Sequence, residues 1–236
     1  MSEESKDLVE QNIELPAIRE VTGEVETLTR TSEYLPQIRV YGSESTIVKE
    51  GVFPMGHLGL YISADKIVDL GTEVEAVVID WRPRAAIVSG DSPVSFFGKY
   101  NEETKTWEFS KEFTEIKDQA MSKVKGYLVG LEYLLYLPEY QRLCLFFMGS
   151  VTLRRESANM KAILEQDKPV NEKVALIKIK LIKTSQYTWH GVTVTPSSTP
   201  VVIEDRQEIL EGMGKFRNPK DSGVELADEG DSGRAR

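Results

Sequence analysis

Alternation of hydrophobic and polar residues predicts that this chain is built mainly from β-strands. In the clearest example, residues 173–183, alternate apolar side chains point one way while Lys178 and Lys180 point the other way. A side-chain period of two is the pattern of a strand with one buried face. Residues 187–195 alternate in the same manner after a short connection at 184–186. We therefore predict a strand pair whose lysines share one face.

Four further segments have the composition and alternation of strands. They are residues 37–41, 73–88, 127–137 and 142–148. Pro83 interrupts the second of them, which predicts a sheet edge or a β-bulge at that position. Residues 94–109 predict a hairpin, with limbs at 96–100 and 106–109 joined by the loop 101–105.

Three segments are predicted to be helices, and the first and last of them are amphipathic. They are residues 111–125, 151–166 and 205–216. The apolar residues that share a face are Phe113, Ile116, Ala120 and Val124 in the first helix and Ile209, Met213 and Phe216 in the last. Gly126 is expected to end the first helix, because glycine is common just after a helix C-terminus.

Strands dominate this interpretation, and the helices are inserted between them. The order favours one antiparallel, barrel-like domain over residues 35–217 rather than alternating β-α units. Residues 1–34 are polar and acidic with little periodicity, and we interpret them as a mobile arm. Residues 218–236 combine Gly, Ser and acidic side chains. They are too polar to offset the entropy of folding, so we expect a disordered acidic tail.

The composition argues against several classes of enzyme. Two histidines and one cysteine in 236 residues are too few for a zinc site rich in thiolate or imidazole ligands. The chain lacks the motifs of zinc proteases, P-loop proteins, dinucleotide-binding proteins and α/β-hydrolases. We therefore expect no catalytic activity, no metal ion and no cofactor.

Three features bear on the cellular compartment. No apolar run approaches the roughly 20 residues of a membrane-spanning helix. The N-terminal residues lack the basic and apolar regions of a signal peptide. Cys144 is the one cysteine, cannot form an internal disulfide, and is expected to be a buried thiol in a reducing compartment. We expect a cytoplasmic protein without a membrane partner.

Charge is unevenly distributed along the chain. The formal net charge is −9, but residues 142–183 carry 9 basic and 4 acidic side chains. Residues 1–50 carry 11 acidic and 5 basic side chains, and residues 201–236 carry 9 acidic and 6 basic ones. A basic surface formed by the middle segment would attract a polyanion whatever the net charge. An ordinary solvated strand face would have the same composition.

Cations stand beside aromatic residues on the predicted strand pair. Lysines attract phosphates, and exposed rings stack on unpaired bases, so this combination suits a single-stranded nucleic acid. The alternative is that the aromatic residues belong to the core. The candidate residues are Lys178, Lys180, Lys183, Tyr187, Trp189 and His190.

Two arginine pairs are further candidates for binding phosphates or stacking on bases. In residues 81–84, Arg82 and Arg84 flank Pro83 and follow Trp81, although an edge-strand kink with solvated arginines fits equally well. Arg154 and Arg155 lie near a predicted helix start, where backbone amides could also hold an anion. Glu156, however, could simply neutralise that pair.

A nuclease is a less favoured alternative. Glu115 and Lys117 fit the Glu-x-Lys half of a metal-nuclease pattern, and Asp80 or Asp91 could add a carboxylate for magnesium. The pattern is common by chance, and here it falls on a predicted helix rather than a strand.

Several of these segments together resemble phage-encoded single-stranded DNA-binding proteins of the OB-fold type. The segments are residues 53–57 (FPMGH), 81–84 (WRPR), 147–150 (FMGS), 185–191 (SQYTWHG) and 192–200 (VTVTPSSTP). The resemblance covers about residues 35–217. It implies a five-stranded antiparallel barrel with helical and hairpin insertions, DNA on one concave face, and an acidic tail that contacts replication partners. This chain instead ends in residues 233–236 (GRAR), unlike the acidic and apolar ends typical of such tails.

The sequence thus predicts sequence-tolerant binding of single-stranded DNA during phage replication or recombination, in the host cytoplasm. Replication or recombination proteins are possible further partners. The alternatives are a phage protein-interaction or structural β-domain and, less favoured, the metal-dependent nuclease.

Overall fold

The computed structural model describes residues 35–43, 45–63, 66–88, 94–149, 151–183, 188–203 and 206–217. The expected arm at 1–34 and the expected tail at 218–236 lie outside these residues. The strands are β1 (Gln37–Val40), β2 (Leu58–Ser63), β3 (Lys66–Gly71), β4 (Glu73–Ile87), β5 (Val94–Phe97), β6 (Lys99–Asn101), β7 (Thr106–Glu108), β8 (Tyr127–Leu137), β9 (Arg142–Met148), β10 (Val174–Lys183) and β11 (Thr188–Pro196). The helices are α1 (Thr46–Lys49), α2 (Lys111–Met121), α3 (Val151–Leu164) and α4 (Arg206–Arg217), with short 3-10 turns η1 (Pro138–Tyr140) and η2 (Val170–Glu172).

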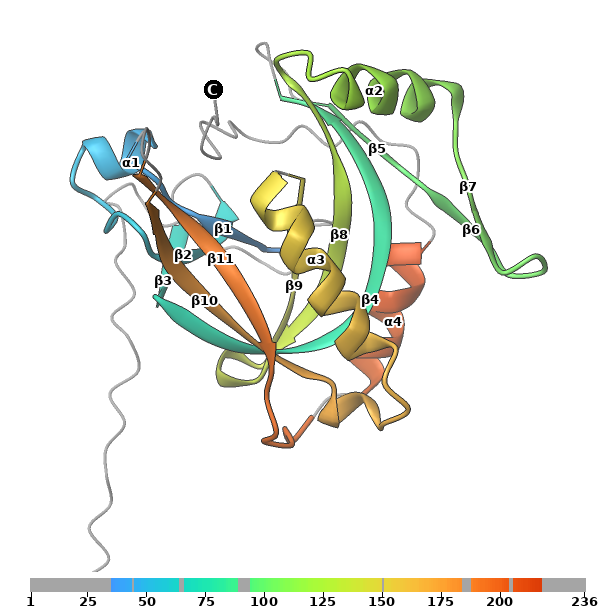
Figure 1. Cartoon of the computed structure of the whole chain (residues 1–236). Helices are drawn as coiled ribbons and strands as arrows, with labels where there is room; N and C mark the ends of the chain where they lie inside the picture. Colours follow the sequence, from blue (N-terminus) through green and yellow to red (C-terminus); the bar gives the residue numbers. More distant parts are fainter. Residues whose placement is uncertain are drawn as a thin grey trace, which may run out of the picture.

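One large mixed sheet dominates the molecule, so the mainly β prediction is confirmed. Its strands lie in the order β11-β10-β4-β8-β9-β1-β2-β3, and β5 adds to β4. The β1–β9 pair is parallel and the other pairs are antiparallel. Strands β6 and β7 form a separate hairpin that projects from the body (Figure 1). The main sheet curves strongly but ends at β11 and β3, so these pairings do not close it into a barrel.

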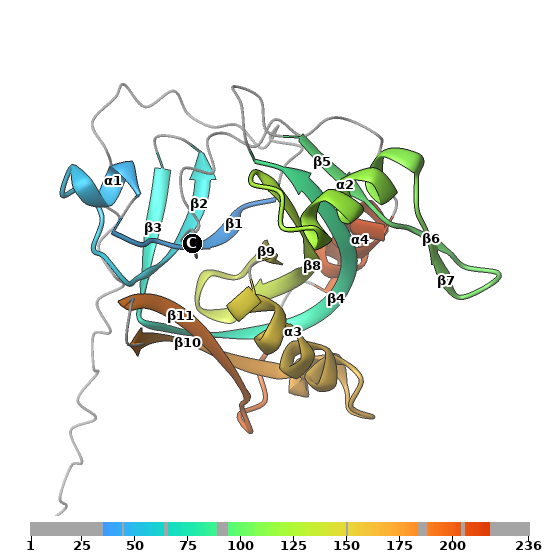
Figure 2. The same ribbon diagram turned by 45° about the horizontal axis from the view of Figure 1, so that its top comes forward.

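Strand β4 is the long central strand, and it bends around the molecule (Figure 2). One edge pairs with β8 along most of its length. The other edge pairs with β10 over the first residues and with β5 from Arg84 onward. Between these two pairings, at residues 79–83, this edge of β4 has no partner strand among the described residues, so the predicted sheet edge at Pro83 is confirmed. The alternative of a β-bulge at Pro83 is wrong, because the register shift falls between Val78 and Asp80 and the strand continues through Pro83. The proline instead stands just before the β5 pairing begins, and its carbonyl accepts a bond from Gly98.

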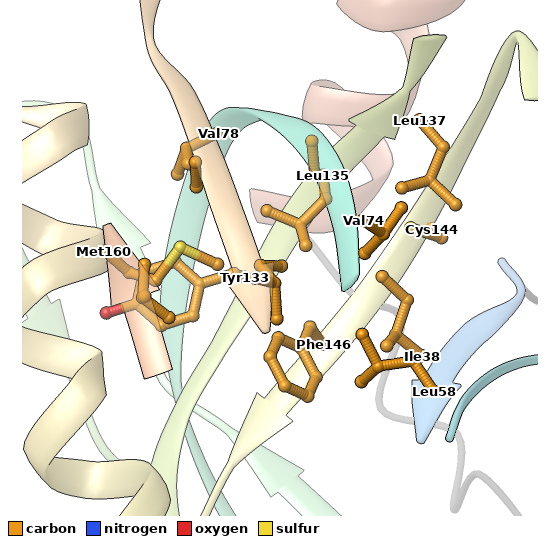
Figure 3. Packing of buried hydrophobic residues seen from close by; sticks show 14 of the residues in the cluster. Ile38, Leu58, Val74, Val78, Tyr133, Leu135, Leu137, Cys144, Phe146 and Met160 are labelled. Carbon is orange, nitrogen blue, oxygen red and sulfur yellow. The ribbon is translucent and has the colours of Figure 1, made fainter. Parts of the chain in front are cut away.

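Two helices cover opposite faces of the sheet. Helix α3 lies inside the curve of the sheet (Figure 1), where Met160 and Ile163 join the largest buried cluster. Figure 3 shows Met160, Tyr133 and Phe146 among the side chains of that cluster. Helix α4 packs on the other face, where Ile209 and Phe216 cover a second cluster. Both faces of a strand are therefore buried where α3 covers one side of the sheet and α4 covers the other.

The helices match the predicted segments with one difference. Helix α4 buries Ile209 and Phe216 and partly buries Met213, which confirms its predicted face. Helix α2 buries Phe113 and Ile116, but it ends at Met121 rather than at Lys125. The backbone of Lys123 is left-handed, with φ of 60°, which stops the helix before Val124. Cys144 is buried as expected.

Candidate nucleic-acid interface

The register between β10 and β11 decides which candidate residues lie together. Lys178 pairs with Thr193, Lys180 with Gly191 and Ile182 with Trp189. Directly paired residues of an antiparallel ladder lie on the same face, and that face repeats every second residue. Lys178, Lys180 and Trp189 therefore share one face, which we call the lysine face. It consists of Lys178, Lys180, Ile182, Trp189 and Thr193.

The lysine face is the outer face of the curved sheet. The opposite face of the same strands carries Ile177, Val192 and Val194, which are buried against α3. The lysine-bearing side of β10 begins at Val174 under α4 and emerges into solvent farther along. The predicted separation of lysines from the core is confirmed. The concave side, by contrast, is occupied by α3, so it is the outer face that offers the lysines.

Two carboxylates, Glu73 and Glu75, lie beside the two lysines of the lysine face. Lys178 contacts Glu73 of β4 at 2.6 Å between Nζ and Oε2, with both side chains about half exposed. Glu75 follows on the same face and accepts a bond from Ser197 Oγ at 2.7 Å. Lys180 is exposed and forms no ion pair within the described residues. Exposed pairs of this kind contribute about 0–1 kcal/mol to stability, so a phosphate would compete with Glu73 for Lys178.

Trp189 is half-buried on the lysine face, so its ring is neither fully in the core nor fully in solvent. His190 points to the other face, paired with Leu181. There it lies against Gly56, where an added Cβ would come within 2.5 Å of the imidazole ring. His190 is therefore a packing residue of the inner face. The cross-strand register also assigns Lys183 to that inner face, where it is exposed at the strand end. Tyr187 lies outside the described residues.

Helix α3 protects the free edge of β11. Glu156 Oε2 accepts a bond from the Val194 amide at 2.9 Å, and Asn159 Nδ2 donates to the Val194 carbonyl at 3.3 Å. These two side chains replace a neighbouring strand at that position. A ligand at β11 would therefore meet the strand's outer face rather than this part of its edge.

The arginines of residues 81–84 are not on a surface. Arg82 and Arg84 are 6% and 1% exposed, and both contact Glu132, which is 1% exposed. Arg82 also donates to the Phe216 carbonyl at 2.7 Å, and Arg84 donates to Ser95 Oγ at 3.1 Å. The expectation that these guanidiniums could meet a phosphate is not supported by this geometry. Arg82, Arg84 and Glu132 form a buried ion-pair network, which we call the buried network.

Burial and ion pairing act in opposite directions on this network. Burial alone would raise the pKa of Glu132, but the positive charges of Arg82 and Arg84 outweigh it and hold that pKa below its ordinary value. Burial lowers the pKa of Arg82, against the attraction of Glu132. Aromatic rings complete the enclosure, with the Arg82 guanidinium 3.8 Å from the Phe97 centroid and that of Arg84 4.4 Å from the Phe147 centroid. The network is thus built to hold charges inside the protein.

Trp81 lies on the inner side of β4, away from the lysine face. It is half-buried and packs against the core cluster that α3 covers. Its ring lies 5.4 Å from the ring of Trp107, and Lys161 Nζ lies 5.0 Å above it. Trp81 and Trp189 are therefore on opposite faces of the sheet and do not form one site.

The sequence did not single out Trp107 or Tyr100 as candidate residues. The predicted hairpin, with its loop at residues 101–105, would place Tyr100 opposite Thr106. In the structure, Asn101 pairs with Thr106, so Tyr100 lies opposite Trp107 with ring centroids 5.1 Å apart. Asn101 Oδ1 accepts bonds from the amides of Glu103 and Thr104, which fixes the tighter turn. Asn101, a residue that favours turns, was the feature of the sequence that could have indicated this register.

The remaining candidates lie apart from the lysine face. Arg155 is exposed in the first half of α3, and the side chain of Arg154 lies outside the described residues. For the nuclease alternative, Glu115 is paired with Lys111 on α2, as its predicted helix implied. Asp80 accepts bonds from the Trp81 amide and from Arg217, while Asp91 is outside the described residues. The described residues contain no cluster of three or more His, Cys, Asp or Glu side chains arranged for a metal ion.

Comparisons of the chain with protein-family models, with curated proteins and with solved structures each found no match. Within the described ranges, no helix combines the length and the apolar composition needed to cross a membrane.

Proposed function

We propose that this protein binds single-stranded DNA without sequence preference and without catalysis, using the lysine face of β10 and β11. The observation that carries the proposal is the register that places Lys178, Lys180 and Trp189 on one outer face. Through the resemblance described above, such binding would serve phage DNA replication or recombination.

The lysine face combines the two interactions that a single strand offers. Lys178 and Lys180 are two residues apart, so their ammonium groups follow one another along the strand and can contact successive phosphates. Trp189 lies on the neighbouring strand beyond Lys180, where its partly exposed ring can stack on an unpaired base. Stacking contributes about 1–3 kcal/mol per base and tolerates any sequence, because every base has a π-face. In a paired duplex the bases are already stacked, so we expect a preference for single strands.

The order of the strands supports an OB-like interpretation of the fold. Counted from the long bent strand β4, the chain continues through β8, β9, α3, β10 and β11. The sheet order of these five strands is β9-β8-β4-β10-β11, with the first strand in the middle. A partly open five-stranded barrel that binds oligonucleotides is the OB architecture. Strand β1 pairs with β9 on the side where the barrel would close, and it approaches β11.

A protein-binding role is the second candidate, and one observation favours it. A shallow depression next to the lysine face is lined by three carboxylates together with apolar side chains. Its lining includes Glu73, Glu75, Glu139, Leu176, Val201 and Val202. Val202 is 80% exposed. Carboxylates repel phosphates, so this depression suits a basic protein segment better than DNA.

A gel-shift measurement with labelled oligo(dT) and a matched duplex, each at low and moderate salt, tests the proposal. We expect binding to oligo(dT) that weakens with salt, because lysine–phosphate contacts release counterions. The duplex should bind more weakly at both salt concentrations. Lys180→Ala should weaken oligo(dT) binding, whereas Lys168→Ala removes an equally exposed lysine outside this face and should not. Absence of oligo(dT) binding at low salt would contradict the proposal and leave the protein-binding role.

A further inference from the structure

A row of aromatic side chains crosses from the inner side of the sheet onto the projecting hairpin. The Trp81 and Trp107 rings lie 5.4 Å apart, and the Trp107 and Tyr100 rings 5.1 Å apart. Phe109 lies beside the row, since a Cβ on Gly98 would lie 3.2 Å from both the Phe109 ring and the Trp107 ring, and the Phe109 ring stacks on Phe113 with centroids 4.6 Å apart. We call Trp81, Tyr100, Trp107 and Phe109 the aromatic row.

The aromatic row is accessible although its rings touch one another. Trp81, Tyr100 and Trp107 are each half-buried, and Phe109 is 46% exposed. An isolated two-stranded hairpin is only marginally stable, so β6 and β7 depend on contacts with the body. Those contacts are the rings themselves, the bond from the Gly98 amide to the Pro83 carbonyl at 3.0 Å, and the ion pair between Arg217 and Glu102. The rings thus hold the hairpin to the body and remain partly exposed to solvent.

Two cations lie beside rings of the aromatic row. Lys161 of α3 lies 5.0 Å above Trp81, and the Arg217 guanidinium lies 5.4 Å from the Tyr100 centroid. Both cations are themselves paired with carboxylates: Lys161 with Glu165 at 3.5 Å, and Arg217 with Asp80 at 2.6 Å and Glu102 at 3.3 Å. Glu108 accepts a bond from Asn101. Glu103 is exposed at the hairpin tip. With both signs present, this region attracts phosphates less than the lysine face does, and its rings are the main feature.

We infer that the aromatic row is a second base-stacking site for single-stranded DNA, separate from the lysine face. The inference rests on the proposed function, since it names a further contact of the same ligand. Partly exposed rings fit unpaired bases, whose π-faces stack on them without any requirement for sequence. Trp81 and Trp189 occupy opposite faces of the sheet, so a strand that reaches both sites must pass around an edge of the molecule.

The three tryptophans of the chain make the two sites separately observable. Trp81→Phe with Trp189→Phe leaves Trp107 as the one fluorophore, and Trp81→Phe with Trp107→Phe leaves Trp189. Phenylalanine keeps an aromatic ring at each replaced position, and thermal melting checks that each variant is folded. Titration with oligo(dT) should quench both single-tryptophan proteins. In the otherwise unchanged protein, Trp107→Ala should weaken oligo(dT) binding about 5- to 150-fold and leave its salt dependence unchanged, because a stacking contact releases no counterions.

The outcomes separate this inference from the proposed function. Quenching of Trp189 but not of Trp107 would overturn the second site and leave the lysine face in place. Binding in the gel shift with no quenching of Trp107 would also overturn it. Absence of any oligo(dT) binding would overturn both. A Trp107 that is quenched by a protein fraction but not by oligo(dT) would assign the row to a protein partner and contradict the inference.

Discussion

Strands β4 and β10 each carry two cations at alternating positions, yet the two pairs have opposite environments. Arg82 and Arg84 are buried around Glu132, whereas Lys178 and Lys180 lie on an open face beside Trp189. The difference arises from what covers each face. Phe216 of α4, which is 134 positions from Arg82 in sequence, encloses its guanidinium, and no helix of the described chain extends over Lys180. Alternation identifies a face, but distant elements decide whether it is a surface.

The type of cation agrees with this difference. Guanidinium is weakly hydrated and forms several fixed bonds, so it tolerates burial when a carboxylate pairs with it. Ammonium is strongly hydrated and stays at the surface unless it loses its charge. We therefore expect the buried pair to support the fold and the exposed pair to support binding.

The largest expected effect is on the buried network. Glu132→Gln removes the charge that compensates both guanidiniums, and loss of one partner of a buried ion pair costs about 3–5 kcal/mol. Urea unfolding should show this loss in the free energy of unfolding. Glu115→Gln removes a carboxylate from the exposed pair on α2 and should change that free energy by about 0–1 kcal/mol. Similar small losses for both variants would show that the network does not support the fold.

The same carboxylate predicts a dependence of stability on pH. The pKa of Glu132 is lower in the folded protein than its ordinary value. Its contribution to stability is therefore complete above the ordinary glutamate pKa and is lost as the pH falls through the lowered value. The urea concentration at the midpoint of unfolding, measured from neutral pH downward, should therefore decrease over this acidic range. The Glu132→Gln variant should lose less stability over that range, because glutamine does not titrate. If the wild-type protein and the Glu132→Gln variant lost the same stability as the pH fell, this role of Glu132 would be contradicted.

Trp189→Ala compares binding with stability at one position of the lysine face. If the ring stacks on a base, the variant should lose about 1–3 kcal/mol of oligo(dT) binding. A half-buried ring should contribute less to folding than the roughly 3–5 kcal/mol that a core aromatic contributes. Fluorescence anisotropy and urea unfolding of the same variant measure both quantities. Normal binding with a large loss of stability would make Trp189 a core residue.

Much of the fold could be predicted from the sequence because it depends on local periodicity. Residues 127–137 and 142–148 coincide with β8 and β9, and the strand pair at β10 and β11 is predicted to within one residue at each end. The candidate site was predicted less well. The lysines of β10 followed from alternation alone, but the burial of Arg82 and Arg84 depends on Glu132 and α4, which are distant in sequence. The aromatic row depends on a one-residue hairpin register, which local patterns do not fix.

The salt dependence of oligo(dT) binding decides whether the lysine face binds DNA. The double variant Lys178→Ala with Lys180→Ala should be compared with Lys111→Ala and Lys168→Ala, which remove the same charge from exposed positions elsewhere. We expect only the first variant to flatten the plot of log affinity against log salt, by about 0.7 for each phosphate that the protein no longer neutralises. Both variants should unfold at nearly the wild-type urea concentration. An equal slope in the two folded variants would contradict the assignment of the lysine face to DNA.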